Sequence, residues 1–388
     1  MTFFLSDNII SSLGFTTKEN FSSLLKGEIG ITTIDDSNFY PEPFPASMID
    51  EQRLEKEFKF FAAKYSNNSI FTKLEKMLLL SVEDALSNTE IDIASGKTAI
   101  VLSTTKGNID LLEKEKAGYF ETNRVLLWKL GEIIGKFFNN PNEVVVLSNA
   151  CISGVLAINT AAMLINSNQF DNVIVTGGDL VSKFVISGFM SFLSLSPTAC
   201  KPFDKNRDGL SLGEAAGTIV LSKFPAKGKH NMVFKGGSSA NDANHISGPS
   251  RTGEGSFIAI KKAISEAEIS AEKIDHISSH GTATPYNDEM ESIAIERHHM
   301  ENVPVNSIKG YLGHTLGAAG IIETAILLRE MHQNTMLKTA GFKENGVSRI
   351  INIINENTKK ELNTCLKMAS GFGGSNAALV VSKIEAPP

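Results

Sequence analysis

The sequence predicts an α/β fold built from alternating strands and helices, and three observations lead to this prediction. Short apolar runs rich in β-branched residues, such as 98–103 (TAIVLS) and 173–176 (VIVT), are typical of buried strands. Segments with helical spacing of apolar residues follow most of these runs, and this alternation is typical of layered folds with buried parallel strands. An internal repeat indicates in addition that the unit is duplicated.

Length, composition and charge indicate a large globular protein and argue against a nucleic-acid binder. The chain has 388 residues, which predicts two domains or one large fused core. Apolar residues make up 42% and charged residues 21%, values typical of a soluble globular protein. The formal net charge of −6 argues against a general nucleic-acid binder, because such proteins carry a strongly basic face.

Cysteine usage and the N-terminus bear on the compartment. Three widely spaced cysteines, Cys151, Cys200 and Cys365, form neither a disulfide framework nor a zinc motif. This sparse, odd set fits a reducing compartment, so we expect a cytoplasmic protein without a metal site. The opening MTFFLSDNII lacks the basic start of a secretory signal, and no apolar run is long enough to cross a bilayer. We therefore expect no membrane association.

The first half of the chain is predicted to span residues 1–225, because Pro225 and Gly228 mark a boundary at 223–230. Its first 50 residues are expected to be irregular, with a short helical pattern near 21–25 and no strong opening strand. The other elements expected here are the helical stretches 69–86, 111–138 and 153–165, the strands 98–103, 144–147, 173–176 and 217–221, and a turn-rich loop at 201–209.

The second half, residues 226–388, repeats the alternation of strands and helices. Its expected strands are 232–236, 274–278, 303–308, 365–369 and 377–381, its expected helices are 255–267, 288–298 and 315–329, and a polar loop is expected at 241–252.

The internal repeat becomes visible when residues 313–328 (GHTLGAAGIIETAILL) are aligned with 150–165 (ACISGVLAINTAAMLI). Gly317 then meets Gly154, and each segment is a predicted helix rich in small residues that begins directly behind a short turn. Chance similarity between small-residue helices is the alternative. A true duplication predicts that the two helix starts face a shared centre.

Cys151 lies where the predicted strand 144–147 turns sharply into the helix 153–165. A thiol at a helix start is close to unpaired backbone N–H groups and to the positive end of the helix dipole. Both are expected to lower its pKa from about 8.5 and to favour the nucleophilic thiolate. The alternative is that Cys151 is a buried cysteine that only fills space.

Three further features follow the ends of predicted strands, where ligands gather in parallel α/β folds. They are His280, the segment 309–314, and the glycine-rich loop 370–376. A single histidine or a glycine-rich loop is weak evidence alone. Together with Cys151 they predict one site at a common edge.

The motifs that carry these residues resemble those of a known family. SNACISG, SSHGTATPYND, NSIKGYLGHTLGAAG and GFGGSN occur in this order, and the loop KPFDKNRDGLSLGEAAG adds to them. From about residue 70 onward the chain resembles the β-ketoacyl-acyl carrier protein synthases of the elongating, two-histidine type. The resemblance implies a thiolase-like fold, a duplicated αβαβα five-layer sandwich, and a homodimer.

The resemblance implies a decarboxylating Claisen condensation with Cys151 as the nucleophile. Cys151 accepts an acyl group from an acyl carrier protein, which splits one hard step into two. Malonyl carrier protein then loses CO2, and its enolate attacks the acyl group. His280 and His314 are implied as donors, through Nε2, to the oxygen that becomes negative, and each such donor contributes about 3 kcal/mol.

Further roles follow from the same resemblance. Lys309 is implied to act electrostatically near the two histidines, and Glu323 to organise Lys309. Taken alone, Lys309 would be an ordinary surface lysine, and Glu323 a charge that is costly in an apolar helix unless paired.

The oxyanion hole and the cofactor arm are implied in the same way. The backbone N–H groups of Cys151 and Phe372 would bind the oxyanion, and Gly373 beside Phe372 would allow a sharp turn. Phe372 also matches an aromatic residue that gates acyl entry. The hydroxyls implied to bind the phosphopantetheine arm are those of Thr282, Thr284 and Ser247.

Partners follow from the implied mechanism. The substrates travel on the phosphopantetheine of an acidic acyl carrier protein, so no metal and no other cofactor is expected. Because this chain is also acidic overall, docking requires a local basic patch. Fatty-acid, polyene and polyketide-like biosynthesis all remain open, and so does a heterodimer with a ketosynthase-like subunit.

Two alternatives remain. A thiolase needs a second catalytic cysteine near the glycine-rich loop, but that loop carries Phe372, and Cys365 lies in a predicted strand. A non-catalytic, chain-length-shaping partner subunit usually lacks the nucleophile, whereas this chain keeps Cys151 together with its histidines and lysine.

Overall fold

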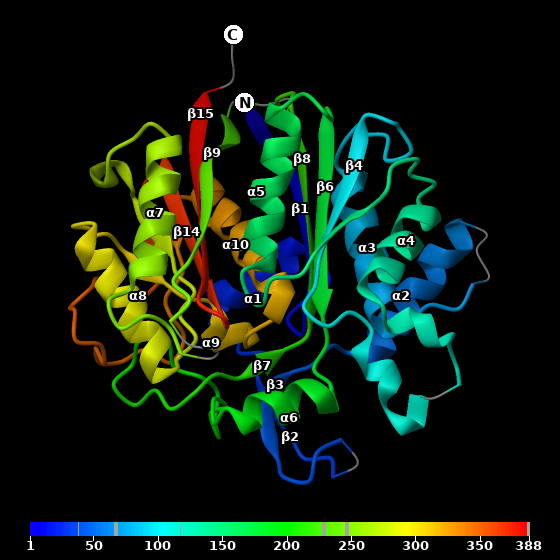
Figure 1. The fold of residues 1–388 in the computed structure, drawn as a ribbon, viewed down its shortest axis with the longest axis horizontal. Helices are drawn as coiled ribbons and strands as arrows, with labels where there is room; N and C mark the ends of the chain where they lie inside the picture. The colour runs from blue at the N-terminus through cyan, green and yellow to red at the C-terminus, as the bar shows by residue number, and fades with distance from the viewer. Residues whose placement is uncertain (38, 66–68, 117, 227–229, 245–247, 386–388) are drawn as a thin grey trace.

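A computed structural model describes residues 1–388 except 38, 66–68, 117, 227–229, 245–247 and 386–388 (Figure 1). Its main feature is a ten-stranded sheet in the order β11-β10-β14-β15-β9-β1-β8-β6-β4-β5. The strands are β1 (Thr2–Ile10), β4 (Thr98–Ser103), β5 (Val145–Leu147), β6 (Asn172–Asp179), β8 (Ala215–Ser222), β9 (His230–Asn241), β10 (His276–Ser278), β11 (Val305–Asn306), β14 (Thr364–Gly371) and β15 (Ser375–Glu385).

The strand order repeats, which is the topological sign of duplication. From one edge inward the strands of the first half come in the order β5, β4, β6, β8, β1, and from the other edge those of the second half come in the order β11, β10, β14, β15, β9. In each half the third strand along the chain is therefore at the edge, followed by the second, fourth, fifth and first. The two sets meet where β1 pairs antiparallel with β9, with Phe3 opposite Val233. The boundary at 225/226 falls between β8 and β9 and stays a prediction.

Helices divide the molecule into five layers (Figure 1). Helices α5 (Ser153–Asn166) and α10 (Ala319–Gln333) form the middle layer, between the two sets of strands. One outer layer holds α2 (Glu51–Lys64), α3 (Lys73–Ser87) and α4 (Leu127–Phe137), and the other holds α7 (Glu254–Glu266) and α8 (Pro285–Arg297). This arrangement is the predicted αβαβα sandwich.

Smaller elements complete the fold. They are the helices α1 (Thr17–Lys26), α6 (Lys183–Ser191) and α9 (Lys309–Leu312), a sheet of β2 (Thr32–Ile34), β3 (Phe44–Ser47) and β7 (Leu212–Gly213), and the pair β12 (Thr335–Met336) and β13 (Thr358–Lys359). Among the described residues, no helix is long and apolar enough to span a membrane.

Glycines allow the two middle helices to approach closely. A Cβ atom on Gly320 would lie 2.3 Å from the backbone nitrogen of Val155, and one on Gly154 would lie 2.8 Å from that of Ile321. Both distances are shorter than real contacts, so each helix needs a residue without a side chain at the crossing. The small residues that define the sequence repeat therefore have a packing role.

The prediction that residues 1–50 lack an opening strand was wrong. Strand β1 has nine residues and lies in the middle of the sheet, between β8 and β9. Polar residues in the middle of β1 interrupt the apolar pattern by which a strand is recognised. In the folded protein these residues have tertiary partners: Ser6 donates to the Ala85 carbonyl (2.6 Å), and Asp7 pairs with Arg329 (3.1 Å).

The largely helical prediction for 111–138 was also wrong. Among the described residues of this segment α4 is the only α-helix, and three short 3-10 helices precede it. Buried Glu75 holds this irregular segment, because its carboxylate accepts from Asn108 Nδ2 (3.0 Å) and binds both Nε and Nη2 of Arg124 (2.9 and 2.7 Å). Side-chain anchors of this kind replace the regular helical pattern.

Smaller differences concern strand direction and element ends. The sheet is mixed rather than parallel, since β8 runs antiparallel to both β1 and β6. The strand expected at 303–308 is reduced to β11. The helix expected from 315 begins only at Ala319, after a 3-10 turn over Leu316–Ala318.

The close crossing of α5 and α10 predicts that Gly320→Ala destabilises the protein. The added methyl group overpacks a rigid contact, which typically costs about 1–3 kcal/mol of unfolding free energy. Gly188→Ala in α6 is the matched control, because nothing lies within 4 Å of its Cβ position. Thermal and denaturant unfolding should show a clear loss for the first variant and little change for the second; equal stability would contradict the packing argument.

Candidate active site

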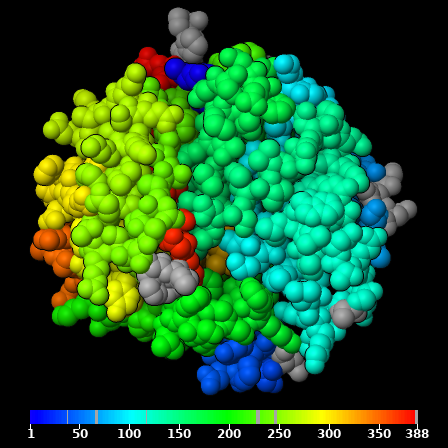
Figure 2. Space-filling model, in the orientation of Figure 1, coloured from blue at the N-terminus to red at the C-terminus, as the bar shows by residue number. Residues whose placement is uncertain are grey.

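A cavity of about 590 Å³ opens where the loops after several strands meet. Its lining includes Cys151, His280, His314, Thr282 and Phe372. In Figure 2 the surface is hollowed where the red C-terminal segment meets the green segment. The structure thus brings the predicted residues from distant parts of the chain to one place.

Cys151 lies in a tight elbow between β5 and α5, two residues before the helix begins. Ala150 adopts a positive φ of 44°, which a non-glycine residue rarely does. Ser153 holds the elbow, because its Oγ accepts from the Asn149 N–H (2.8 Å) and donates to the Ala150 carbonyl (2.6 Å). The strained turn directs Cys151 into the cavity.

The glycine-rich loop lies directly against this elbow. A Cβ atom on Gly371 would be 3.0 Å from the backbone nitrogen of Cys151, so only glycine permits this approach without a shift. Ser375 Oγ donates to Asn149 Oδ1 (2.9 Å) and ties the loop to the elbow. The backbone N–H of Phe372 donates to the Cys151 thiol. The Phe372 N–H is therefore close to the sulfur, while an oxyanion hole formed with the Cys151 N–H stays a prediction.

Burial raises the pKa of the Cys151 thiol to about 11. The ammonium groups of Lys309 and Lys106 and the Phe372 N–H act in the opposite direction, but burial is the larger effect. The expectation of a lowered pKa was wrong for this reason: the start of a helix is not enough when the thiol is almost completely removed from water. With this pKa the thiol is neutral at pH 7.

The two histidines face each other beside the cysteine. Their ring centroids are 5.1 Å apart, and the rings are nearly perpendicular, at 84°. One ligand-type atom from each of Cys151, His280 and His314 lies within 4.8 Å of the others. Burial, followed by the charges of Lys309 and Lys367, lowers the pKa of both histidines well below 6.5, so both are neutral at pH 7.

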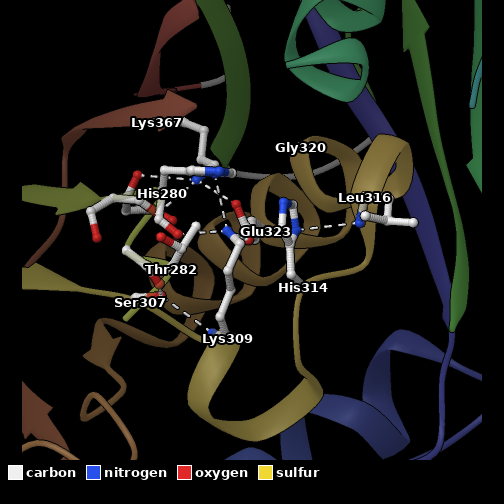
Figure 3. Close-up of polar contacts among 12 residues, drawn as sticks. His280, Thr282, Ser307, Lys309, His314, Leu316, Gly320, Glu323 and Lys367 are labelled. Carbon is white, nitrogen blue, oxygen red and sulfur yellow. Dashed lines mark hydrogen bonds and ion pairs between the residues drawn. The ribbon is translucent and has the colours of Figure 1, made fainter. Parts of the chain in front are cut away.

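Hydrogen bonds at Nδ1 select the tautomer of each ring. The Leu316 N–H donates to Nδ1 of His314 (3.3 Å), and the Lys309 ammonium lies 3.1 Å from Nδ1 of His280 (Figure 3). A nitrogen that accepts a hydrogen bond carries no proton in a neutral imidazole. Each ring therefore carries its proton on Nε2 and can donate from that atom.

Lys309 lies behind the histidines and is almost completely buried (Figure 3). Its ammonium donates to the His280 carbonyl (2.5 Å) and forms a short ion pair with Glu323. The alternative that Lys309 is an ordinary surface lysine does not fit this burial. Its ammonium is also the ion-pair partner that the carboxylate of Glu323 needs within an apolar helix.

Sequence reasoning missed three buried carboxylates that hold the loops of the site. Asp179, at the end of β6, accepts from the N–H groups of Thr105 (2.9 Å) and Gly317 (2.7 Å), so it joins loops from both halves. Glu291 accepts from the N–H groups of His280 and Gly281, both at 2.7 Å, and Asp288 accepts from Thr282 (3.0 Å). The spacing of Asp288 and Glu291 on one helix face was the available signal.

Lys367 was missed as well. It is completely buried in β14 and pairs with Glu323 Oε2 at 2.6 Å (Figure 3). A single lysine within the apolar run of a predicted strand was the signal.

The remaining predicted residues lie at the cavity in different ways. The hydroxyls of Thr282 and Thr284 are 2.9 Å apart, and both residues line the cavity. The Phe372 ring contacts those of Phe189 and Phe192, with centroids 5.6 and 5.1 Å apart. Gly373 has a φ of 80° and faces open space. Ser247 lies outside the described residues.

Cys151, His280 and His314 also have the spacing of a metal site. Two ammonium groups, those of Lys309 and Lys367, share the same buried network. Their positive charge disfavours a metal cation, so the residues present do not fit one.

Comparisons with known proteins agree with this geometry. Residues 8–225 match the family model "Beta-ketoacyl synthase, N-terminal domain", and residues 232–343 match "Beta-ketoacyl synthase, C-terminal domain". The chain belongs to the β-ketoacyl synthase family. It is therefore an acyl-transferring condensing enzyme.

Relatives along the whole chain include named synthases. A putative mitochondrial 3-oxoacyl-[acyl-carrier-protein] synthase of Schizosaccharomyces pombe is 29% identical over 96% of this chain and 97% of its own length. A 3-oxoacyl-[acyl-carrier-protein] synthase 2 of Coxiella burnetii is 27% identical over 97% of both chains.

Solved structures share the fold. A β-ketoacyl synthase from Burkholderia phymatum is 22% identical with a TM-score of 0.87, covering 99% of both chains. A ketosynthase solved with its chain length factor, from Xenorhabdus doucetiae, is 24% identical with a TM-score of 0.84, covering 98% of this chain and 97% of that one. These likenesses confirm the thiolase-like fold.

The raised pKa predicts how Cys151 reacts with iodoacetamide. Only the thiolate is alkylated, so the rate should rise about tenfold per pH unit from pH 7 to 9, without a plateau below about pH 10. Mass spectrometry of tryptic peptides measures this, with buried Cys200 and Cys365 as internal controls. A plateau near pH 7 would mean that the helix start prevails over burial.

Proposed function

We propose that this protein is a β-ketoacyl-acyl carrier protein synthase, in which Cys151 is acylated and then receives a carbanion from malonyl carrier protein. The observation that carries the proposal is the group of Cys151, His280 and His314 in one buried cavity, with both histidines protonated at Nε2. A nucleophile beside two neutral donors suits a reaction that builds negative charge on a thioester oxygen.

The first half-reaction transfers the acyl group. Cys151 sulfur attacks the thioester carbonyl, the bond from the carbonyl carbon to the pantetheine sulfur breaks, and the thiol proton ends on the departing pantetheine. The backbone N–H groups of Cys151 and Phe372 bind the oxyanion that forms in between.

The second half-reaction forms a carbon–carbon bond. Malonyl thioester loses CO2 and becomes an enolate, whose oxygen accepts hydrogen bonds from Nε2 of His280 and His314. The enolate carbon attacks the carbonyl of acyl-Cys151. The tetrahedral intermediate then expels the Cys151 thiolate, which regains a proton. Neutral histidines suit this step, because they donate without surrendering a proton to the enolate.

The partner in both steps is an acyl carrier protein. Its phosphopantetheine arm would pass Thr282 and Thr284, whose hydroxyls line the cavity, and Ser247 remains a further candidate. Exposed Arg251 also lines the cavity and offers a positive charge to an acidic carrier protein. No metal or organic cofactor is required beyond the pantetheine, and a cytoplasmic location remains our expectation.

We also propose a homodimer that forms along the edge strand β5. This strand ends the sheet, and Val145 on it is exposed. Trp128 of α4, which packs beside β5, is 57% exposed, although tryptophan is usually buried. An exposed edge strand with apolar neighbours favours pairing with another chain. A heterodimer with a ketosynthase-like subunit is the alternative.

The nucleophile is tested with Cys151→Gln. This variant should still decarboxylate malonyl carrier protein, because the histidines and Lys309 remain. Condensation should fall below roughly a thousandth of the native rate, because no acyl-enzyme forms. Radiolabelled CO2 release and mass spectrometry of the product measure the two steps. Native protein that folds correctly but is never acylated at Cys151 would favour the non-catalytic partner subunit.

The dimer is tested with Trp128→Glu. A buried charge at the interface should convert a particle of twice 41.9 kDa into a monomer. Sedimentation equilibrium measures the mass. Phe60→Glu is the matched control, because Phe60 is 68% exposed on α2, a helix outside the proposed interface. A native protein that is already monomeric, or a variant that stays dimeric, would rule out this interface.

A further inference from the structure

Lys367 is a buried cation for which the proposed mechanism has no role. It has no exposed surface, and its neighbours along β14 are apolar. Its ammonium donates to the carbonyls of Ser279 (2.9 Å) and Ser278 (3.3 Å), the two residues before His280. It also pairs with Glu323 Oε2 at 2.6 Å.

Glu323 is therefore shared between two cations. Its Oε1 faces Lys309, and its Oε2 faces Lys367 (Figure 3). A simple Lys309–Glu323 pair would be neutral, whereas the three side chains together carry one net positive charge. Burying an ammonium without a carboxylate of its own lowers the free energy of unfolding. The second lysine is therefore present although it costs stability.

The surplus charge lies behind the two histidines. Lys309 contacts Nδ1 of His280, and Lys367 binds the carbonyl of the preceding residue. In an imidazole ring Nε2 lies on the opposite side from the carbon that carries the side chain, away from Nδ1 and its contacts, and both histidines line the cavity. The positive charge of the two lysines on one side of the histidines favours negative charge on the other side, where the enolate oxygen would lie.

We propose that Lys367 is a positioning residue that stops Glu323 from neutralising Lys309, so that the site keeps a net positive charge behind His280 and His314. Its bonds to Ser278 and Ser279 also fix the strand end that carries His280. The inference rests on the proposed condensation and adds a group to it that stabilises the enolate without touching substrate.

The pH dependence follows from the charges around the histidines. Lys309 of α9 contacts the His280 ring, Cys151 lies beside both histidines, and Glu291 of α8 accepts from the His280 backbone N–H. Behind them, Lys367 of β14 pairs with Glu323 of α10, and Asp288 of α8 accepts from the Thr282 N–H. Both lysines lower the pKa of the histidines. Loss of Lys367 removes one of these charges, so the pKa rises, and protonated histidine then appears at higher pH.

The experiment compares Lys367→Met, Glu323→Gln and the double variant in the full chain. The readout is kcat/KM for malonyl carrier protein decarboxylation between pH 5 and 8. Lys367→Met should move the acid limb up by roughly one pH unit, and Glu323→Gln should move it down. The double variant has the native net charge, so its acid limb should return to within about 0.3 units of the native position.

Two results would overturn the inference. One is a Lys367→Met profile that falls in height but does not move along the pH axis, which indicates a merely structural role. The other is a double variant whose acid limb stays with that of Lys367→Met. Should Lys367→Met not fold, the other two variants still test the inference, because the acid limb should move down in Glu323→Gln and stay near the native position in the double variant. Acylation of native Cys151 is measured in parallel, because its absence would refute the proposed function rather than the role of Lys367.

Discussion

The close crossing of α5 and α10 is the contact on which the site depends. Each helix begins behind the loop that carries a reactive residue, Cys151 for α5 and His314 for α10. Because Gly154 and Gly320 let the backbones touch, these loops meet at one cavity although they come from different halves. A side chain at either glycine would separate not only two helices but also the nucleophile from one of its donors.

Burial is the second condition of the site, and it acts on each group differently. It raises the pKa of Cys151, lowers that of both histidines, and leaves Lys309 and Lys367 dependent on one carboxylate. Removal from water makes each remaining charge act more strongly on the next. The same burial that slows the reaction of the thiol therefore strengthens the hydrogen bonds that we propose His280 and His314 donate to the enolate.

Much of the site could be predicted from the sequence, because its residues follow strand ends within compact motifs. Local pattern marked Cys151, His280 and His314 as candidates, and the family resemblance supplied their predicted roles. A lone lysine in an apolar run marks Lys367, but its role, like that of Asp179, depends on partners that only the folded sheet brings near. Strand β1 was missed for a related reason: Ser6, Asp7 and Asn8 break the apolar alternation, and tertiary hydrogen bonds compensate for them.

The central place of β1 has a consequence for how the chain is made. Strand β1 can pair with β8 only after the residues up to Ser222 have been synthesised, because Phe3 lies opposite Ser222. The other edge of β1 stays unpaired until β9 has been synthesised. Such distant pairings slow folding, and the growing chain carries an open strand edge for that time. We therefore expect exposure to aggregation during synthesis to follow from this topology, independent of the chemistry that the finished fold performs.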